Sequence, residues 1–125
     1  MSNWTEQELS AIDSQDELHI STARADGSIR KLVIIWSVQV GDDLYVRAVR
    51  GVNGLWYRHA MEIGRGEIDA GGVHKSTTFT PISDESTNAS IDEAFRRKYN
   101  RYAKSIVDST VTDQAREATL RVDPK

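Results

Sequence analysis

Short turns join neighbouring strand-like segments in this chain, and they restrict it to an antiparallel sheet. The dipeptide Asp26-Gly27 is a strong hairpin signal, because a two-residue type I′ turn needs a positive φ at both central positions. It separates a strand expected over 18–23 from a longer strand expected over 29–40. Parallel strands need long crossover connections, so local turns of this kind favour antiparallel pairing.

The strand expected over 29–40 alternates in a way that predicts which face is buried. One face is wholly apolar and is expected to be core; it carries Leu32, Ile34, Trp36, Val38 and Val40. The opposite face becomes polar along its length and carries Val33, Ile35, Ser37 and Gln39. One alternative is that Val33, Ile35 and Ser37 on this second face form a surface for self-association.

Further segments complete an α+β pattern within a single domain over 1–125. Additional strands are expected over 44–50, 66–70, 73–82 and 119–122. Helices are expected over about 5–14, where Thr5 and Glu8 fit a capping box, over 55–63, over about 90–104, and briefly over 113–118. About six strands with local hairpins predict a small antiparallel β-barrel with flanking helices, because closure removes exposed sheet edges.

The expected helix over 90–104 is amphipathic. Ser90 and Glu93 fit a second capping box at its start. The apolar side chains that recur at helical spacing are Ile91, Phe95, Tyr99, Tyr102 and Ile106. A row of basic residues lies on the outer side, and it is either a solvated helix face or a surface for a partner or a ligand tail.

Composition narrows the classes of function. The net charge of -3 excludes a broad basic surface, so no nucleic-acid partner is expected. The chain has no cysteine, which rules out disulfides, thiolate catalysis and cysteine-based zinc sites. The polar start has no apolar signal core, and the longest apolar run, over 32–36, is too short to span a membrane. We therefore expect a cytoplasmic protein without a membrane partner.

The segment over 44–63 combines a strand, a glycine-bounded turn and the start of a helix. A helix start leaves backbone N–H groups without partners and carries partial positive charge, which suits a phosphate. Arg47 and Arg50 precede the turn and Arg58 follows it, and arginine binds phosphate oxygens in pairs. The segment predicts an anion site, with an ordinary strand-turn-helix connection as the alternative.

Catalytic motifs built from side chains alone are missing from the sequence. There is no nucleophile elbow and no Walker-type phosphate loop. His19, His59 and His74 lie on different expected elements without metal-ligand spacing, so no metal site is expected; His59 falls on the helix that begins at the anion site. A redox cofactor brings its own reactive atoms, so these absences favour cofactor chemistry or plain binding over hydrolysis.

The order of elements, and the stretches over 22–31 and 34–72, resemble the flavin-binding split-barrel superfamily. This superfamily includes pyridoxamine-phosphate-oxidase-like proteins and deazaflavin-dependent nitroreductases, and the chain is similar to a small, uncharacterised bacterial group within it. The resemblance implies a split barrel that binds FMN or a deazaflavin coenzyme. It also implies a homodimer with the cofactor at the interface.

The resemblance also implies site residues by position. Arg24 and Arg30 correspond to basic residues of the first hairpin that hold the cofactor phosphates. The full expected cofactor-binding set, including backbone N–H groups of the turn, is Arg24, Arg30, Arg47, Ala48, Val49, Arg50, Gly51, Trp56 and Tyr57. No catalytic residue is assigned. Ala25 and Asp26 stand where relatives often carry a lysine and a small residue, and a carboxylate at Asp26 repels a phosphate.

Aromatic side chains supply flat apolar surface for a flavin ring. Trp36 is expected in the core, whereas Trp56 and Tyr57 are expected either in the core or against the ring. The resulting hypothesis is a flavin- or deazaflavin-dependent oxidoreductase that transfers hydride to a small-molecule acceptor. The alternative is a non-catalytic cofactor-binding or self-associating module of the same fold.

Overall fold

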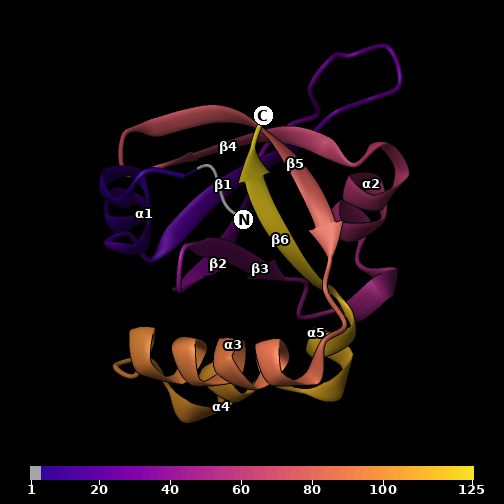
Figure 1. Cartoon of the computed structure of the whole chain (residues 1–125). Coiled ribbons are helices and arrows are strands. Elements are labelled where there is room, and N and C mark those ends of the chain that lie inside the picture. Colours follow the sequence, from indigo (N-terminus) through magenta and orange to yellow (C-terminus); the bar gives the residue numbers. More distant parts are fainter. Residues whose placement is uncertain (1–3) are drawn as a thin grey trace.

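The computed structural model describes residues 4–125 and shows a closed antiparallel barrel (Figure 1). Its strands are β1 (Glu17–Thr22), β2 (Val33–Val40), β3 (Asp43–Arg47), β4 (Arg65–Ala70), β5 (Val73–Pro81) and β6 (Thr119–Pro124). They run around the barrel in the order β1-β2-β3-β6-β5-β4. This confirms the predicted α+β split barrel. Residues 1–3, part of the single domain expected over 1–125, lie outside this description.

Helices cover the barrel on several sides. They are α1 (Glu6–Asp13), the short 3-10 helix η1 (Gly51–Asn53), α2 (Leu55–Ile63), α3 (Glu85–Lys98), α4 (Lys104–Asp108) and α5 (Asp113–Glu117). In Figure 1, α3 and α4 lie below the barrel, whereas α1 and α2 flank it on opposite sides. Within residues 4–125, no helix has the length and apolar character needed to cross a membrane.

The strand β2 changes partner halfway along its length. Its first half, over 33–36, pairs with β1, and its second half, over 37–40, pairs with β3. β3 ends at Arg47, so among the described residues no strand pairs with the first half of β2 on that side. The separation of β2 from the chain that follows β3 is the split of this barrel.

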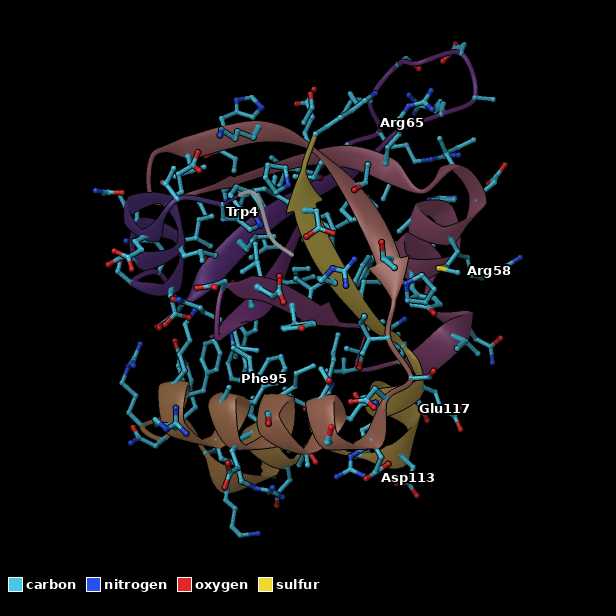
Figure 2. The ribbon with its side chains drawn as sticks, in the orientation of Figure 1. Trp4, Arg58, Arg65, Phe95, Asp113 and Glu117 are labelled. Atoms are coloured by element: carbon cyan, nitrogen blue, oxygen red, sulfur yellow. The ribbon has the colours of Figure 1, made fainter. Side chains whose placement is uncertain are left out.

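Two hydrophobic clusters stabilise the fold. The first fills the barrel and includes Leu18, Ile20 and Leu120, which are at most 1% exposed. The second lies between the barrel and α3 and includes Val38 and Phe95. Figure 2 shows Phe95 pointing from α3 toward the barrel. Burial of such side chains drives the helix onto the sheet, because removing apolar surface from water is favourable.

The expected core face of β2 is only partly buried, which corrects one prediction. Val38 is 1% exposed, but it packs in the cluster under α3. Leu32 and Ile34 are 47% and 53% exposed. On the opposite face, Ile35 packs against the barrel cluster. The reason is the split, because α3 covers the second half of β2 and leaves the first half open.

The first hairpin is wider than the sequence predicted. Gly27 has a φ of 89°, but no residue other than glycine has a positive φ among those described, so Asp26 does not form a type I′ turn. Instead the Arg24 N–H donates to the Ser28 carbonyl (2.8 Å), and the Asp26 carboxylate accepts from the Ser28 N–H (2.9 Å). The loop continues to Val33, where β2 begins, and it projects from the barrel (Figure 1).

Helix boundaries follow the caps. The capping box of Thr5 and Glu8 is present at α1, as predicted. The predicted capping box of Ser90 and Glu93 is wrong, because α3 begins at Glu85 with Asp84 as its N-cap. The Asp84 carboxylate accepts from the Thr87 N–H at 2.8 Å, and this satisfies a helix-start donor upstream of Ser90. The helix also ends at Lys98, before the expected limit near 104.

Candidate functional site

A pocket of about 550 Å³ opens in the split between β2 and the chain that follows β3. Its walls come from β1, the β1–β2 loop, the first half of β2, the segment over 48–50 and the start of α2. Aliphatic side chains such as Ile20 and Ile35 form much of the inner wall. The pocket therefore has the mixed character of a small-molecule site, apolar inside with a few placed polar groups.

Four cationic side chains line this pocket. They are Arg24, Arg30, Lys31 and Arg50, and no acidic side chain lines it with them. Among residues 4–125, none of the four forms an ion pair. An unneutralised group of cations at one pocket favours an anionic ligand, since opposite charge raises the local ligand concentration.

Two of the predicted arginines come from the first hairpin. Arg24 lies at the start of its loop, where its guanidinium donates to the Ser28 hydroxyl and the Ile29 carbonyl, each at 3.3 Å. The Nε of Arg30 is buried and has no hydrogen-bond partner in the described structure. Buried polar atoms are nearly always paired in proteins, so this donor is an exception within the described structure. Asp26 is turned toward Ser28 and does not line the pocket.

The start of α2 adds backbone donors. Its N-cap is Gly54, which supplies no side-chain cap, and both Gly54 and Leu55 line the pocket. The first N–H groups of a helix have no intrahelical partner, and the helix dipole places partial positive charge there. This end of α2 is therefore a suitable place for a phosphate.

The turn before α2 supplies fewer free amides than predicted. The N–H of Ala48 donates to the Ala118 carbonyl (3.1 Å), and the N–H of Gly51 donates to the Ala48 carbonyl (2.9 Å). Within residues 4–125, the N–H groups of Val49 and Arg50 make no hydrogen bond. Only the latter two are available to a ligand, and both residues line the pocket.

Arg47 does not join this group, which corrects the expectation that it contacts a phosphate. Its side chain is 0% exposed and forms an ion pair with Asp92. The five N–H donors of the guanidinium are all used by groups on α3, β6 and the loop before α5: Thr119 Oγ1, Asp92 Oδ1, the Thr110 carbonyl, and the carbonyl and side-chain oxygens of Asn88. No donor is left for a ligand.

The two neighbouring aromatic residues Trp56 and Tyr57 lie in different surroundings. Trp56 is half-buried and lines the pocket. Tyr57 is 7% exposed and belongs to the barrel cluster, and burial raises the pKa of its hydroxyl. Their rings meet edge to face at 6.3 Å. Trp36 stacks on Tyr99 with ring centroids 3.8 Å apart. Trp56 is thus the aromatic residue of the predicted pair that a ligand can reach.

Three polar side chains of the pocket lie outside the predicted cofactor-binding set. Lys31 follows Arg30 directly, so the basic character of the hairpin was the available signal. Thr22 ends β1 with its side chain at the pocket, which no motif indicates. His59 lies one helical turn beyond Leu55 on α2 and also lines the pocket. No potential metal-binding cluster of histidine and acidic side chains occurs among residues 4–125.

We compared the chain with known protein families and with curated proteins. Residues 8–122 match the model of a bacterial family described as "Uncharacterized protein conserved in bacteria (DUF2255)". No curated protein matches the chain.

Three solved structures share the architecture. A conserved hypothetical protein from Mycobacterium tuberculosis is 10% identical, with a TM-score of 0.63 over 97% of this chain and 79% of that one. An F420-H2 dependent reductase is 15% identical, with a TM-score of 0.61 over 86% of this chain and 93% of that one. The heme storage protein HutZ from Vibrio cholerae is 14% identical, with a TM-score of 0.63 over 96% and 89% of the two chains. At these identities the similarity shows the fold.

Proposed function

The chain belongs to the DUF2255 family of bacteria, and we propose that it binds the phosphate of a flavin or deazaflavin in the pocket between β2 and the chain that follows β3. The observation that carries this proposal is the convergence of four cations that form no ion pair and an uncapped helix start on one pocket. The similarity in fold to an F420-H2 dependent reductase supports a redox cofactor of this class, because F420 is a deazaflavin.

The phosphate would be held by Arg24, Arg30 and Arg50 together with backbone donors. The free N–H groups of Val49 and Arg50 lie beside the start of α2, which adds the positive end of its dipole. Hydrogen bonds between guanidinium groups and phosphate are charge-assisted and stronger than neutral ones. Arg47 is left out, because its donors are already used.

The ring would lie against the aliphatic wall and Trp56. Ile20, Ile35 and Ala48 provide the apolar side of the pocket, and Trp56 offers a partly exposed aromatic surface. When bound, such a ring accepts and donates hydride. The contribution of the chain is to orient the ring, exclude water from one face, and leave the other face open to a small-molecule acceptor.

We further propose that the chain forms a homodimer across the rim of this pocket. Four apolar side chains lie exposed at the start of β2 and the start of α2, namely Leu32 (47%), Val33 (38%), Ile34 (53%) and Leu55 (65%). Exposed apolar patches of this kind mark interaction surfaces. A second copy would cover the open side of the split and enclose the ring.

The alternative is a module that binds the cofactor without catalysis. One observation favours it: apart from His59, the pocket is lined by no side chain that commonly exchanges protons near neutral pH. Under this alternative the same cations hold the ligand, but no acceptor is reduced.

The test is an absorption spectrum of the purified protein, followed by calorimetric titration with FMN and with F420. A yellow protein, or tight binding of either compound, supports the proposal. A colourless protein that binds neither compound contradicts it. Binding without reduction by a nicotinamide donor or a reductase partner supports the non-catalytic alternative.

A further inference from the structure

A second cavity of about 260 Å³ adjoins the pocket across the split. It lies between the first half of β2 and the helices α3 and α4. Four of its lining residues, Ile34, Ile35, Val49 and Trp56, also line the larger pocket. A molecule in the second cavity would therefore touch the same side chains as a ring in the first.

The walls of this second cavity are mostly apolar, with Arg47, Ser109 and Thr110 as the polar side chains among its lining residues. Trp36 and Phe95 contribute aromatic surface, and both belong to the cluster that packs α3 onto the barrel. Ile106 on α4 forms part of the wall while remaining 49% exposed. An apolar cavity with an exposed wall residue is accessible from solvent and offers little to a hydrated ligand.

Apart from the free N–H of Val49, the donors of Arg47, Ser109 and Thr110 at this cavity are satisfied within the protein. All five N–H donors of Arg47 are used, as described above. The hydroxyl of Ser109 donates to the Ile106 carbonyl (2.5 Å), and the hydroxyl of Thr110 donates to the Val107 carbonyl (2.6 Å). A charged or strongly polar ligand would lose its hydration here and gain few partners in return.

We propose that this second cavity binds a neutral, apolar molecule of one or two rings. The size agrees, because an apolar cavity of about 150 Å³ is enough for benzene and this one is larger. Resting on the proposed function, the bound molecule is a mostly apolar ring with a carbon–carbon double bond conjugated to a neutral carbonyl. It would take up a hydride from the reduced cofactor at one carbon and a proton from solvent at the other, leaving the cofactor oxidised, since it lies beside the side chains that face the cofactor ring. The cations of the larger pocket then select the cofactor, and the apolar cavity selects the acceptor.

The experiment compares naphthalene with 2-naphthoate, which share a ring system and differ in charge. Binding to the cofactor-free protein is followed by ligand-observed NMR and by the fluorescence of the tryptophans that line the cavity. Naphthalene is expected to bind at least tenfold more tightly than 2-naphthoate. Equal or tighter binding of 2-naphthoate that the Ile106→Trp substitution described below reduces would overturn the proposal, because an anion would then occupy the smaller cavity. Binding of 2-naphthoate that this substitution leaves unchanged belongs to the cations of the larger pocket and is subtracted from the comparison.

A filling substitution locates the site. Ile106→Trp places a larger ring in the cavity, and the position tolerates it because the side chain is half exposed. It is expected to reduce naphthalene binding at least tenfold. The matched control is Met61→Trp, on an exposed position of α2 outside both cavities, which should leave binding unchanged. Circular dichroism checks that both variants fold, and undiminished binding by a folded Ile106→Trp protein would overturn the assignment.

Two further measurements separate this inference from the proposed function. If FMN or F420 binds and naphthalene does not, the second cavity is not an acceptor site and the proposed function stands. If naphthalene binds and neither cofactor does, the cavity assignment stands, but the proposed function and the acceptor role both fail. Naphthalene binding that weakens as protein concentration rises and dimers form would show that a second copy fills the cavity, which overturns the proposal.

Discussion

The guanidinium of Arg47 and the carboxylate of Asp92 form a buried ion pair, with 2.5 Å between Nη1 and Oδ1 and side-chain exposures of 0% and 6%. The second oxygen of Asp92 accepts from Arg116. Burial acts to raise the pKa of Asp92, but hydrogen bonds from Arg116 and Arg47 outweigh it and leave the pKa lowered. The pair fixes the end of β3 against α3, and thereby positions the segment over 48–50 that lines the pocket.

Removing this carboxylate should destabilise the protein strongly. Asp92→Ala leaves two guanidinium groups without their shared partner, and breaking a buried pair costs about 3–5 kcal/mol. Urea denaturation measures the free energy of unfolding. The matched control is Glu93→Ala, which removes an exposed neighbouring carboxylate and should change stability by less than about 0.5 kcal/mol. A similar small effect at Asp92 would contradict the buried-pair account.

The same pair predicts how stability depends on pH. The folded-state pKa of Asp92 lies below its ordinary value of 3.8. Its contribution is therefore fully present above that value and is lost as pH falls through the lower, folded-state pKa. Other carboxylates also titrate there, so the measurement is the stability difference between the wild type and Asp92→Asn. This difference should shrink as the pH is lowered below 3.8; a constant difference would exclude a titrating Asp92.

Substituting an arginine that lines the pocket should weaken cofactor binding, whereas substituting an arginine outside the pocket should not. Arg30→Ala removes a guanidinium that lines the pocket, and loss of a charge-assisted hydrogen bond costs about 1.5–3 kcal/mol, or roughly tenfold or more in affinity. The control is Arg58→Ala, because Arg58 points outward from α2 in Figure 2 and does not line the pocket. Calorimetry with FMN and F420 compares them. Equal affinities in the two variants would place the phosphate elsewhere.

Gly51 should resist substitution more than another turn glycine. It has a φ of +76°, and a Cβ there would lie 2.5 Å from the Cγ of Gln114, whose amide donates to the Val49 carbonyl at 3.2 Å. Gly41 has a φ of +60° with open space around it. Both alanine variants meet the left-handed backbone penalty of roughly 1–2 kcal/mol. Gly51→Ala should lose more stability than Gly41→Ala, and it should also weaken cofactor binding; equal losses of stability would show that Gln114 yields freely.

Self-association should depend on the apolar rim. Leu32→Glu places a charge on the surface proposed to pair with a second copy, and it should shift the protein to monomer in analytical ultracentrifugation. Val52→Glu changes a comparably exposed residue outside the start of β2 and should leave the oligomeric state unchanged. A wild type that sediments as a monomer at working concentration would contradict the proposed dimer.

Local signals predicted the barrel well, because hairpin turns and alternating strands depend on nearby residues. The glycine turns and the Thr5 cap are examples. Contacts between segments that lie far apart in the sequence could not be predicted from such local patterns. The partner of Arg47 is Asp92, which lies on α3, far along the chain. Arg47 and Arg50 are close in the sequence and were expected to act alike, but Arg47 is structural and Arg50 lines the pocket.

The exposure of Leu32 and Ile34 was missed for a related reason. Alternation shows that two faces differ, but it does not show which part of a strand a helix covers. β2 exchanges one neighbour for another at its midpoint, and nothing in the pattern of Ser37 and its neighbours marks that exchange. The candidate site was therefore located approximately, while the identity of its free donors required coordinates.

The two cavities draw their walls from different lengths of the chain. The larger one is enclosed by residues between Ile20 and His59, whereas the smaller one also needs Phe95 and Ile106 from the C-terminal helices. Sequence drift in α3 and α4 can consequently reshape the smaller cavity while the arginine-rich half is inherited intact. Under the proposed function, relatives that keep the cofactor pocket can differ in the compounds that the smaller cavity admits.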